Sequence, residues 1–310
     1  MENLAQEAIQ EIGKAIVGKK HIITQVMTAI LANGHILIED IPGVGKTTLA
    51  LSFSRVLGLD FQRIQFTPDV MPADIAGFSM YKQDTDSFEY QEGAAITNLL
   101  LADEINRTSP KTQSALLEAM EEKKITVDGV TRELPDPYIV IATQNPLGSI
   151  GTHSLPESQL DRFMIKTSMG YPDRQSEITM LKQERVNIAV ELLQELVQGE
   201  DLLKMRKAVE AVFVHDDLYT YVVDIANATR NSIKLELGLS PRGTIALMQM
   251  AKANAFLAGR DYLIPDDIKD VFLVTTNHRV LRSKEARMTN ESVESILKGL
   301  LAAVPLDLAR

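Results

Sequence analysis

The sequence contains neither cysteine nor tryptophan, and it has no long apolar run. Without cysteine there is no disulfide framework and no thiolate metal site, and five scattered histidines do not suggest a zinc site. No apolar run approaches the roughly 18–20 residues that span a bilayer, so no membrane span is expected. The N-terminal MENLAQEAIQEIGK is acidic and amphipathic and is not expected to act as a secretory signal. Together these absences predict a cytoplasmic protein.

Positively charged residues are fewer than negatively charged ones. The 310 residues include 32 Lys and Arg against 42 Asp and Glu, which gives a formal net charge of −10. Because non-specific binding to DNA or RNA needs clustered Lys and Arg, this balance disfavours a nucleic-acid partner. Hydrophobic residues make up 45% and charged residues 24% of the chain, as in ordinary globular proteins, and the length allows two domains.

Apolar runs and helix-like segments alternate in the first half of the chain. Three buried strands are predicted, at HILIED (35–40), NLLLADE (98–104) and PYIVIATQNP (137–146). Helices are predicted at KTTLALSFSRVLGL (46–59) and at KTQSALLEAMEEKK (111–124). This alternation predicts an α/β fold in which a parallel sheet carries helices on both faces.

Two segments interrupt the α/β order and are predicted to form inserted hairpins. Residues Phe78 to Gly93 contain two short strand-like arms around QDTDS. Residues Lys124 to Leu134 carry Asp128-Gly129 between alternating residues, which is a strong signal for a two-residue hairpin turn.

The second half of the chain has a different character, because amphipathic helices follow one another without a β signal. The segments predicted to be helical are 175–186, 202–213, 217–230, 241–259, 265–281 and 292–304. Ser240 before Pro241 has the form of a helix start. We therefore predict an α/β core at 1–172 and an all-α domain at 173–310.

The stretch HILIEDIPGVGKTTLA (35–50) places a strand, a glycine turn and a helix in the order that a phosphate-binding loop requires. The pattern G-x-x-x-x-G-K-[ST] fits at Gly45, Lys46 and Thr47, but Asp40 occupies the place of its first glycine. Gly43 and Gly45 would let the backbone approach the phosphates. Lys46 would bridge the terminal phosphates, and the Thr47 hydroxyl would bind Mg²⁺. The alternative is a structural turn that happens to contain Gly-Lys-Thr.

Polar residues end two of the predicted strands. With a phosphate loop upstream, Asp103 is expected to hold the Mg²⁺ shell and Glu104 to orient and polarise the attacking water. Alone, such a strand end usually meets solvent. Asn145 ends the neighbouring predicted strand, where its side chain would hold that water. The alternative for Asn145 is a plain Asn-Pro turn.

Two arginines are further candidates. Arg162, in LPESQLDRF, would stabilise charge in a neighbouring active site. Its alternative is a surface ion pair with Asp161 or Glu157. Arg242, in LSPRG, begins a helix of the second domain, from which it would reach phosphates across a cleft; its alternative is a solvated helix start.

These motifs together resemble the AAA+ ATPases, and within them the MoxR family. The resemblance covers nearly the whole chain and is carried by GVGKTT, LLLADEINR, IATQNP, LPESQLDRF, LSPRG and, most tellingly, QFTPDVMPADIAG (65–77). It implies that the Walker A residues are Pro42, Gly43, Val44, Gly45, Lys46, Thr47 and Thr48. It also implies Walker B roles for Asp103 and Glu104, a sensor 1 role for Asn145, an arginine finger at Arg162 and a sensor 2 role for Arg242.

The resemblance carries further implications for the binding site. Val17 and Gly18, in IVGKK, would contact the adenine, although the family often has Gln where Lys19 stands. Arg107 would face a subunit interface. The cofactors implied are ATP and Mg²⁺. ATP would lie between the α/β core and the helical lid, and Arg162 of the next subunit would complete the site.

The function implied is that of a ring, most simply a homo-hexamer, which remodels or activates a protein client, in this family often one with a von Willebrand factor A domain. Alternatives are a magnesium-chelatase-like subunit, a DNA motor and a small-molecule P-loop kinase. A kinase would not need the Asp-Glu pair or Asn145. A DNA motor would carry basic hairpins, whereas residues 78–93 contain one Lys against Asp84, Asp86, Glu89 and Glu92.

Overall fold

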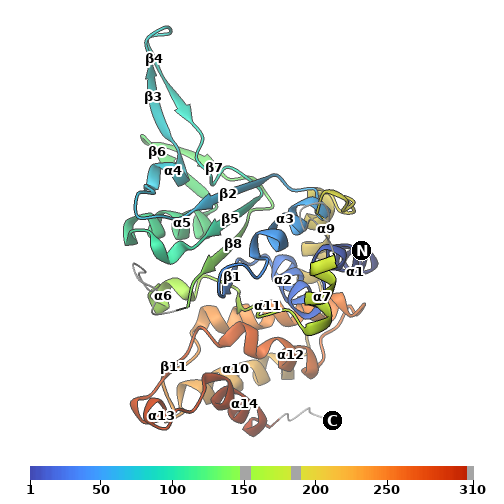
Figure 1. Ribbon diagram of the computed structural model, residues 1–310. Coiled ribbons are helices and arrows are strands. Elements are labelled where there is room, and N and C mark those ends of the chain that lie inside the picture. The colour runs from blue at the N-terminus through green and yellow to red at the C-terminus, as the bar shows by residue number, and fades with distance from the viewer. Residues whose placement is uncertain (147–154, 183–189, 306–310) are drawn as a thin grey trace.

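The centre of the molecule is a five-stranded sheet whose paired strands all run parallel, in the order β2-β5-β8-β1-β9. The computed structural model describes residues 1–146, 155–182 and 190–305, and Figure 1 shows their arrangement. The strands are β1 (Ile36–Glu39), β2 (Phe61–Gln65), β5 (Leu99–Asp103), β8 (Ile139–Gln144) and β9 (Ile165–Thr167). The three predicted strands and the parallel sheet are confirmed, while β2 and β9 were not predicted.

Two hydrophobic clusters cover the two faces of this sheet, because successive strand residues point to opposite sides. Ile36 and Ile38 of β1 belong to one cluster and Leu37 belongs to the other. The first cluster contains residues of α1 (Glu2–Ala15), α2 (Lys20–Leu31), α3 (Lys46–Val56) and α9 (Gly199–Glu210). The second contains residues of α4 (Pro72–Ala76) and α5 (Pro110–Glu122). The flanking helices predicted from the sequence are thus confirmed.

Both inserted hairpins are confirmed. The first consists of β3 (Phe78–Lys82) and β4 (Ser87–Gln91), and it projects away from the body of the molecule (Figure 1). The second consists of β6 (Lys124–Val127) and β7 (Val130–Glu133). At its turn, Asp128 and Gly129 have φ values of 52° and 75°, as a two-residue turn of this kind requires.

Among the described residues, the second half of the chain is helical, as predicted, apart from a short β pair and an isolated bridge between Phe213 and Tyr262. Its helices are α7 (Arg174–Lys182), α9, α10 (Asp216–Arg230), α11 (Pro241–Leu257), α12 (Pro265–Thr276), α13 (Lys284–Met288) and α14 (Val293–Ala303). The end of the helix predicted at 175–186 lies outside the described residues. The unexpected pair is β10 (Leu235–Leu237) with β11 (Leu281–Arg282), which is too short to give a sequence signal. Ser240 caps α11 by accepting a hydrogen bond from the amide of Gly243.

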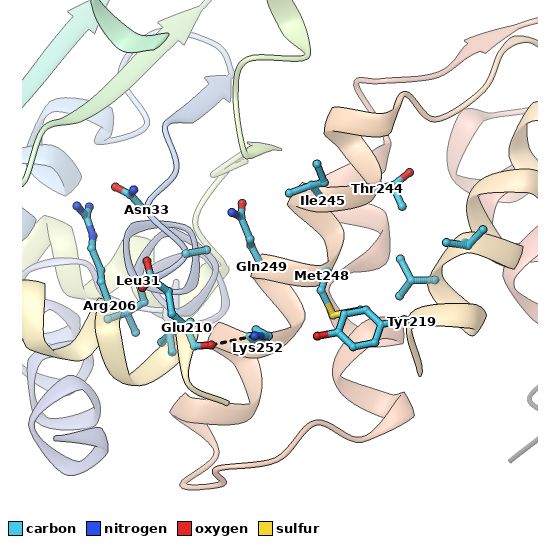
Figure 2. A pocket seen from close by; sticks show the side chains of 14 residues that line it. Leu31, Asn33, Arg206, Glu210, Tyr219, Thr244, Ile245, Met248, Gln249 and Lys252 are labelled. Atoms are coloured by element: carbon cyan, nitrogen blue, oxygen red, sulfur yellow. Dashed lines mark hydrogen bonds between the residues drawn. The ribbon is translucent and has the colours of Figure 1, made fainter. Parts of the chain in front are cut away.

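The helical half packs directly on the sheet half. The Arg206 Nε of α9 donates to the carbonyl of Ile30 in α2 at 3.0 Å, and residues of α11 and α12 join the same hydrophobic cluster as α1 and α2. A cavity of about 450 Å³ lies at this junction, lined by residues of α2, α9, α10 and α11 (Figure 2). The predicted domain boundary near residue 172 stays a prediction. Nowhere in the described chain is there a helix with the length and apolar character that crossing a bilayer demands.

Candidate active site

The glycine loop connects the carboxyl end of β1 to the first residue of α3. Gly43 and Gly45 have φ values of 84° and 94°, in the left-handed region that glycine tolerates best. Gly45 is also the N-cap of α3, so the loop leads directly into the first helical turn, whose amide groups have no partner within the helix. Such a turn, together with the helix dipole, can bind an anion at the start of this eleven-residue helix.

Lys46 links the loop to the acidic strand end. Its side chain is buried, and Nζ donates to the carbonyl of Asp40 at 2.8 Å and to that of Ile41 at 3.3 Å. Burial lowers the pKa of Lys46, while the negative charges of Asp103, Asp40 and Glu104 act in the opposite direction. Those charges act on Lys46 because the carboxyl ends of β1 and β5 lie at the same edge of the parallel sheet. The Asp103-Glu104 pair therefore lies at the same end of the sheet as the loop, with β8 between β5 and β1.

Asp40, which stands where the usual pattern has its first glycine, is held by three hydrogen bonds. Its Oδ1 accepts the amide of Ile41 at 2.9 Å, and its Oδ2 accepts the Ser168 hydroxyl at 2.9 Å and the Gly170 amide at 2.7 Å. The side chain thus fastens the start of the loop to the segment after β9. It does not point into the anion site, in agreement with its place at the end of the strand.

Asp103 is buried and both its carboxylate oxygens are engaged. The Thr143 hydroxyl donates to Oδ1 at 2.6 Å, and Arg63 Nη2 donates to Oδ2 at 2.7 Å. The carboxylate of Asp103 and the hydroxyl of Thr47 are the hard oxygen donors that Mg²⁺ prefers. Within the described ranges no group of three or more His, Asp or Glu residues could hold a metal ion alone. This donor set fits Mg²⁺, because that ion is commonly bound by one or two protein oxygens together with phosphates and water.

Glu104 is held by donors from three directions. Asn145 Nδ2 donates to Oε1 at 3.0 Å, while Gln65 Nε2 at 3.0 Å and Arg107 Nη1 at 2.9 Å donate to Oε2. Burial favours the neutral carboxyl group, but the hydrogen bonds from Arg107 and Asn145 outweigh it, and the pKa of Glu104 is lowered. The backbone of Glu104 is left-handed, with φ 59° and ψ 47°, which turns its side chain out of the strand direction. Such a carboxylate is ionised at neutral pH and can accept a hydrogen bond from water.

The sequence did not indicate two residues of this cluster. Arg63 and Gln65 belong to β2, an edge strand next to β5, and they contact Asp103 and Glu104 respectively. The polar residue Gln65 at the end of FQRIQ could have indicated a site residue, but only with the knowledge that β2 pairs with β5. The side chain of Arg107 pairs with Glu104 within the chain, and its place at a subunit interface stays a prediction.

A cavity of about 380 Å³ opens beside the glycine loop. The described residues that line it include Val17, Pro42, Gly43, Val44, Gly45 and Thr48, with Tyr171 and Leu181. Gly18, Lys46 and Thr47 belong to the same segments without lining the cavity itself. Lys19 Nζ donates to the carbonyl of Tyr171 at 2.7 Å, which ties the segment before α2 to the segment before α7. From the helical half, α7 contributes to this cavity and α11 does not.

Arg162 and Arg242 lie at the other edge of the sheet. Arg162 comes just before β9, and both arginines line a cavity of about 430 Å³ with residues 33–35, which come just before β1. Because these strands run parallel, this is the amino edge, separated from the glycine loop by roughly the length of β1, about 13 Å for four residues.

Both arginines form ion pairs with one carboxylate. Arg162 Nη1 contacts Oε2 of Glu121, and Arg242 Nη2 contacts Oε1 of the same residue, at the end of α5. Arg162 Nη1 also donates to the carbonyl of Leu117 at 2.8 Å. The alternative partners considered from the sequence, Asp161 and Glu157, are therefore not the partners found. Arg242 therefore does not contact the glycine loop of its own chain. The position of ATP between the core and the helical lid stays a prediction.

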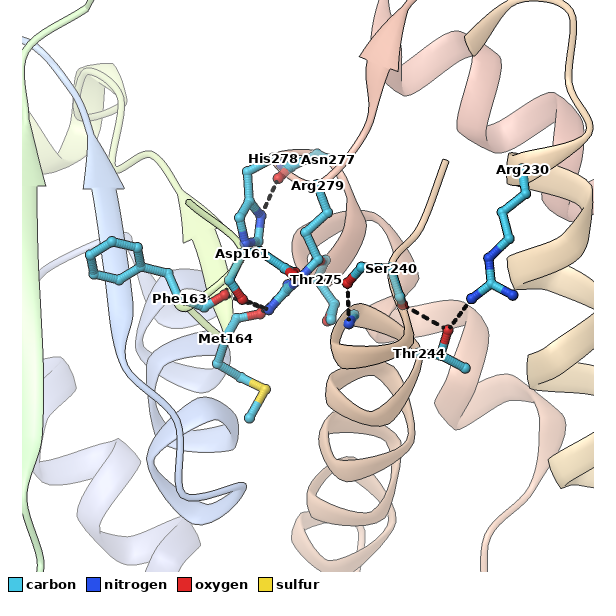
Figure 3. Close-up of polar contacts among 11 residues, drawn as sticks. Asp161, Phe163, Met164, Arg230, Ser240, Thr244, Thr275, Asn277, His278 and Arg279 are labelled. Atoms are coloured by element: carbon cyan, nitrogen blue, oxygen red, sulfur yellow. Dashed lines mark hydrogen bonds and ion pairs between the residues drawn. The ribbon is translucent and has the colours of Figure 1, made fainter. Parts of the chain in front are cut away.

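Asp161 instead anchors the segment that carries Arg162 to the helical half (Figure 3). Arg279 Nε donates to Oδ1 of Asp161 at 2.8 Å, and the Ser240 hydroxyl donates to Oδ2 at 2.8 Å. The buried Arg279 guanidinium also donates to the carbonyls of Phe163 at 2.6 Å and Met164 at 2.9 Å. Since Ser240 precedes Arg242 by two residues, this network fixes the two arginine-bearing segments relative to each other.

Comparisons with known proteins cover the whole chain. Residues 35–165 match the model of the ATPase family associated with various cellular activities (AAA), and residues 227–300 match that of the AAA lid domain. The chain is 45% identical to the uncharacterized protein YeaC of Bacillus subtilis, covering 99% of this chain and 96% of that protein. It is 37% identical to the chaperone MoxR1 of Mycobacterium tuberculosis, covering 97% and 82%. A crystal structure of a candidate ATPase from Cytophaga hutchinsonii superposes with a TM-score of 0.91 at 37% identity, covering 99% and 96%.

Proposed function

Because this chain belongs to the MoxR family of AAA+ ATPases, we propose that it hydrolyses ATP at sites shared between neighbouring copies in a ring. The observation that carries the proposal is the separation of the two clusters. Lys46, Asp103 and Glu104 gather at the carboxyl edge of the sheet, whereas Arg162 and Arg242 sit at the amino edge. One chain cannot bring both sets to one nucleotide, but two chains can if the carboxyl edge of one packs against the amino edge of the other.

Each residue at the carboxyl edge has a distinct task in the proposed reaction. The loop amides of residues 43–47 bind the phosphates, and Lys46 moves from the loop carbonyls to the terminal phosphates. Thr47 and Asp103 hold Mg²⁺, which when bound neutralises phosphate charge. Glu104 accepts a hydrogen bond from the attacking water, and Asn145, already bonded to Glu104, fixes its direction.

The amino edge of the next copy supplies the remaining charge. Arg162 and Arg242 would face the γ-phosphate bound by that neighbour and stabilise the charge that develops during transfer. Sensor 2 thus acts in trans in this proposal. The fixed spacing of the two segments by Asp161 and Ser240 supports their working as a pair.

We further propose a homo-hexamer that remodels or activates a protein client. The name of the relative MoxR1, a chaperone, supports a protein client, and the family resemblance suggests a partner with a von Willebrand factor A domain. The alternative of a magnesium-chelatase-like subunit would share the same site. A small-molecule kinase would not need a second copy's arginines. A cytoplasmic location stays a prediction.

A mixing experiment tests the shared site. Lys46→Ala chains should not bind nucleotide but keep Arg162. Arg162→Ala chains should bind ATP but lack the arginine that would complete the site of a neighbouring chain. Each variant alone should be nearly inactive, and an equimolar mixture should regain ATPase activity well above the mean of the two. A mixture that stays at that mean, with both variants still assembling, would refute a site completed in trans.

A further inference from the structure

The shared carboxylate of Glu121 has no role in the reaction described so far. It lies at the end of α5, where the chain leaves the sheet face for the β6–β7 hairpin. Its two oxygens contact two cations from different halves of the chain, Arg162 from the segment before β9 and Arg242 from the first turn of α11. One carboxylate therefore fixes the separation of two guanidinium groups that no other described contact joins directly.

The contacts leave both guanidinium groups able to bind an anion. Glu121 contacts Nη1 of Arg162 and Nη2 of Arg242, so the other donors of each fork are not used by it. Among the described residues, Nε of Arg162 is buried and has no hydrogen-bond partner. Two positive charges against one negative charge leave the cluster with a net positive charge, which favours a phosphate as the additional partner.

Stability alone does not account for this arrangement. The side chains of Arg162, Arg242 and Glu121 are 30%, 46% and 35% exposed, and ion pairs exposed to this degree contribute little to stability. The rigid anchoring that the fold needs is already provided by Asp161, which Arg279 and Ser240 hold from the buried side (Figure 3). What Glu121 adds is orientation at the exposed ends of two long, flexible side chains.

We propose that Glu121 is a positioning residue, which holds Arg162 and Arg242 as a pair directed at the terminal phosphates of a nucleotide on the neighbouring copy. This inference rests on the proposed function, because it requires that these arginines act in trans. Holding both side chains in place before the nucleotide arrives removes the entropy cost of ordering them during the reaction. Because Arg162 comes from the core and Arg242 from the helical half, both can contact Glu121 only when the helical half is packed against the core.

The test uses Glu121→Ala, with Glu118→Ala as the matched control one turn earlier on the exposed side of α5. Glu121→Ala should lower kcat between about 10-fold and 100-fold, the scale of a misplaced reacting group. Its affinity for a fluorescent ATP analogue should stay unchanged, because its own glycine loop is intact. Glu118→Ala should keep the parental kcat. An unchanged kcat in Glu121→Ala, or a weakened nucleotide affinity in its place, would overturn the proposal.

Mixing pairs of variant chains distinguishes a failure of this inference from a failure of the proposed function. Glu121→Ala chains mixed with Lys46→Ala chains should regain activity, since the Lys46→Ala chains carry correctly held arginines. Glu121→Gln, which keeps an acceptor oxygen without the charge, should lie between the parent and Glu121→Ala in kcat. If Arg162→Ala is rescued by Lys46→Ala but Glu121→Ala is not, Glu121 does not act through its neighbour's nucleotide. If neither is rescued, the shared site itself is wrong.

Discussion

Replacing Glu104 by Gln should separate nucleotide binding from hydrolysis. Glutamine keeps the size of the side chain and one acceptor oxygen for Asn145, but its amide cannot act as a base. Loss of a general base lowers kcat by about 10²–10⁴-fold, which is about 2.7–5.4 kcal/mol of barrier at about 1.36 kcal/mol per tenfold. ATP affinity should change by less than about threefold, because Lys46 and the loop amides, which bind the phosphates, remain.

The variant also changes the local hydrogen bonding in a way that can be checked. Gln65 Nε2 and Arg107 Nη1 both donate to Oε2 of Glu104, so an amide NH₂ at that position would face donors. Losing both hydrogen bonds costs about 2 kcal/mol at about 1 kcal/mol each, less than the roughly 5–15 kcal/mol that holds a typical protein folded. Steady-state phosphate release and equilibrium binding of a fluorescent nucleotide measure the two effects, with Glu118→Gln as the control. Parental turnover in Glu104→Gln would remove Glu104 from the mechanism.

Three more predictions concern Glu104, His35 and Asp161. The active form of Glu104 is the carboxylate, so activity is present above its lowered pKa and is lost as pH falls through that pKa. Since Arg107 helps to lower this pKa, Arg107→Ala should move the acidic limb of the kcat–pH profile to higher pH. An unmoved limb would contradict the assigned cause. Burial lowers the pKa of His35 to about 4, so the neutral ring stabilises the fold fully above about pH 6.5 and progressively less down to pH 4. The loss amounts to about 3 kcal/mol at 1.36 kcal/mol per pH unit, and urea unfolding across that range should show it in the parent and not in His35→Gln. Asp161→Ala leaves the buried Arg279 without its carboxylate and should cost about 3–5 kcal/mol, against a negligible loss for Glu157→Ala in the same thermal unfolding assay.

The strands that the sequence predicted are the ones buried on both faces. The residues of β1, β5 and β8 are almost all buried, and a strand buried on both faces reads as an unbroken apolar run. The edge strands lacked this signal, because β2 is FQRIQ with three exposed polar residues and β9 has only three residues. Their positions are decided by pairing with β5 and β1, which local pattern does not encode.

The residues of the candidate site likewise fall into those that the local sequence indicates and those that only the fold brings together. The glycine loop is a local feature, so spacing alone singled out Gly43, Gly45, Lys46 and Thr47 as candidates. Asn145 and Glu104 were each placed at a strand end, and their contact follows from the neighbouring positions of β8 and β5. The meeting of Arg162, Arg242 and Glu121 could not be predicted, since it depends on how α11 docks against α5 across more than a hundred residues of chain.

The dependence of specific ATPase activity on protein concentration tests the central claim most directly, when the assembly state is followed in the same samples by sedimentation velocity. If the arginines of one copy complete the nucleotide site of another, activity per chain should rise with the fraction of assembled protein and vanish where single chains predominate. Full activity per chain in samples that sediment as single chains would contradict the account.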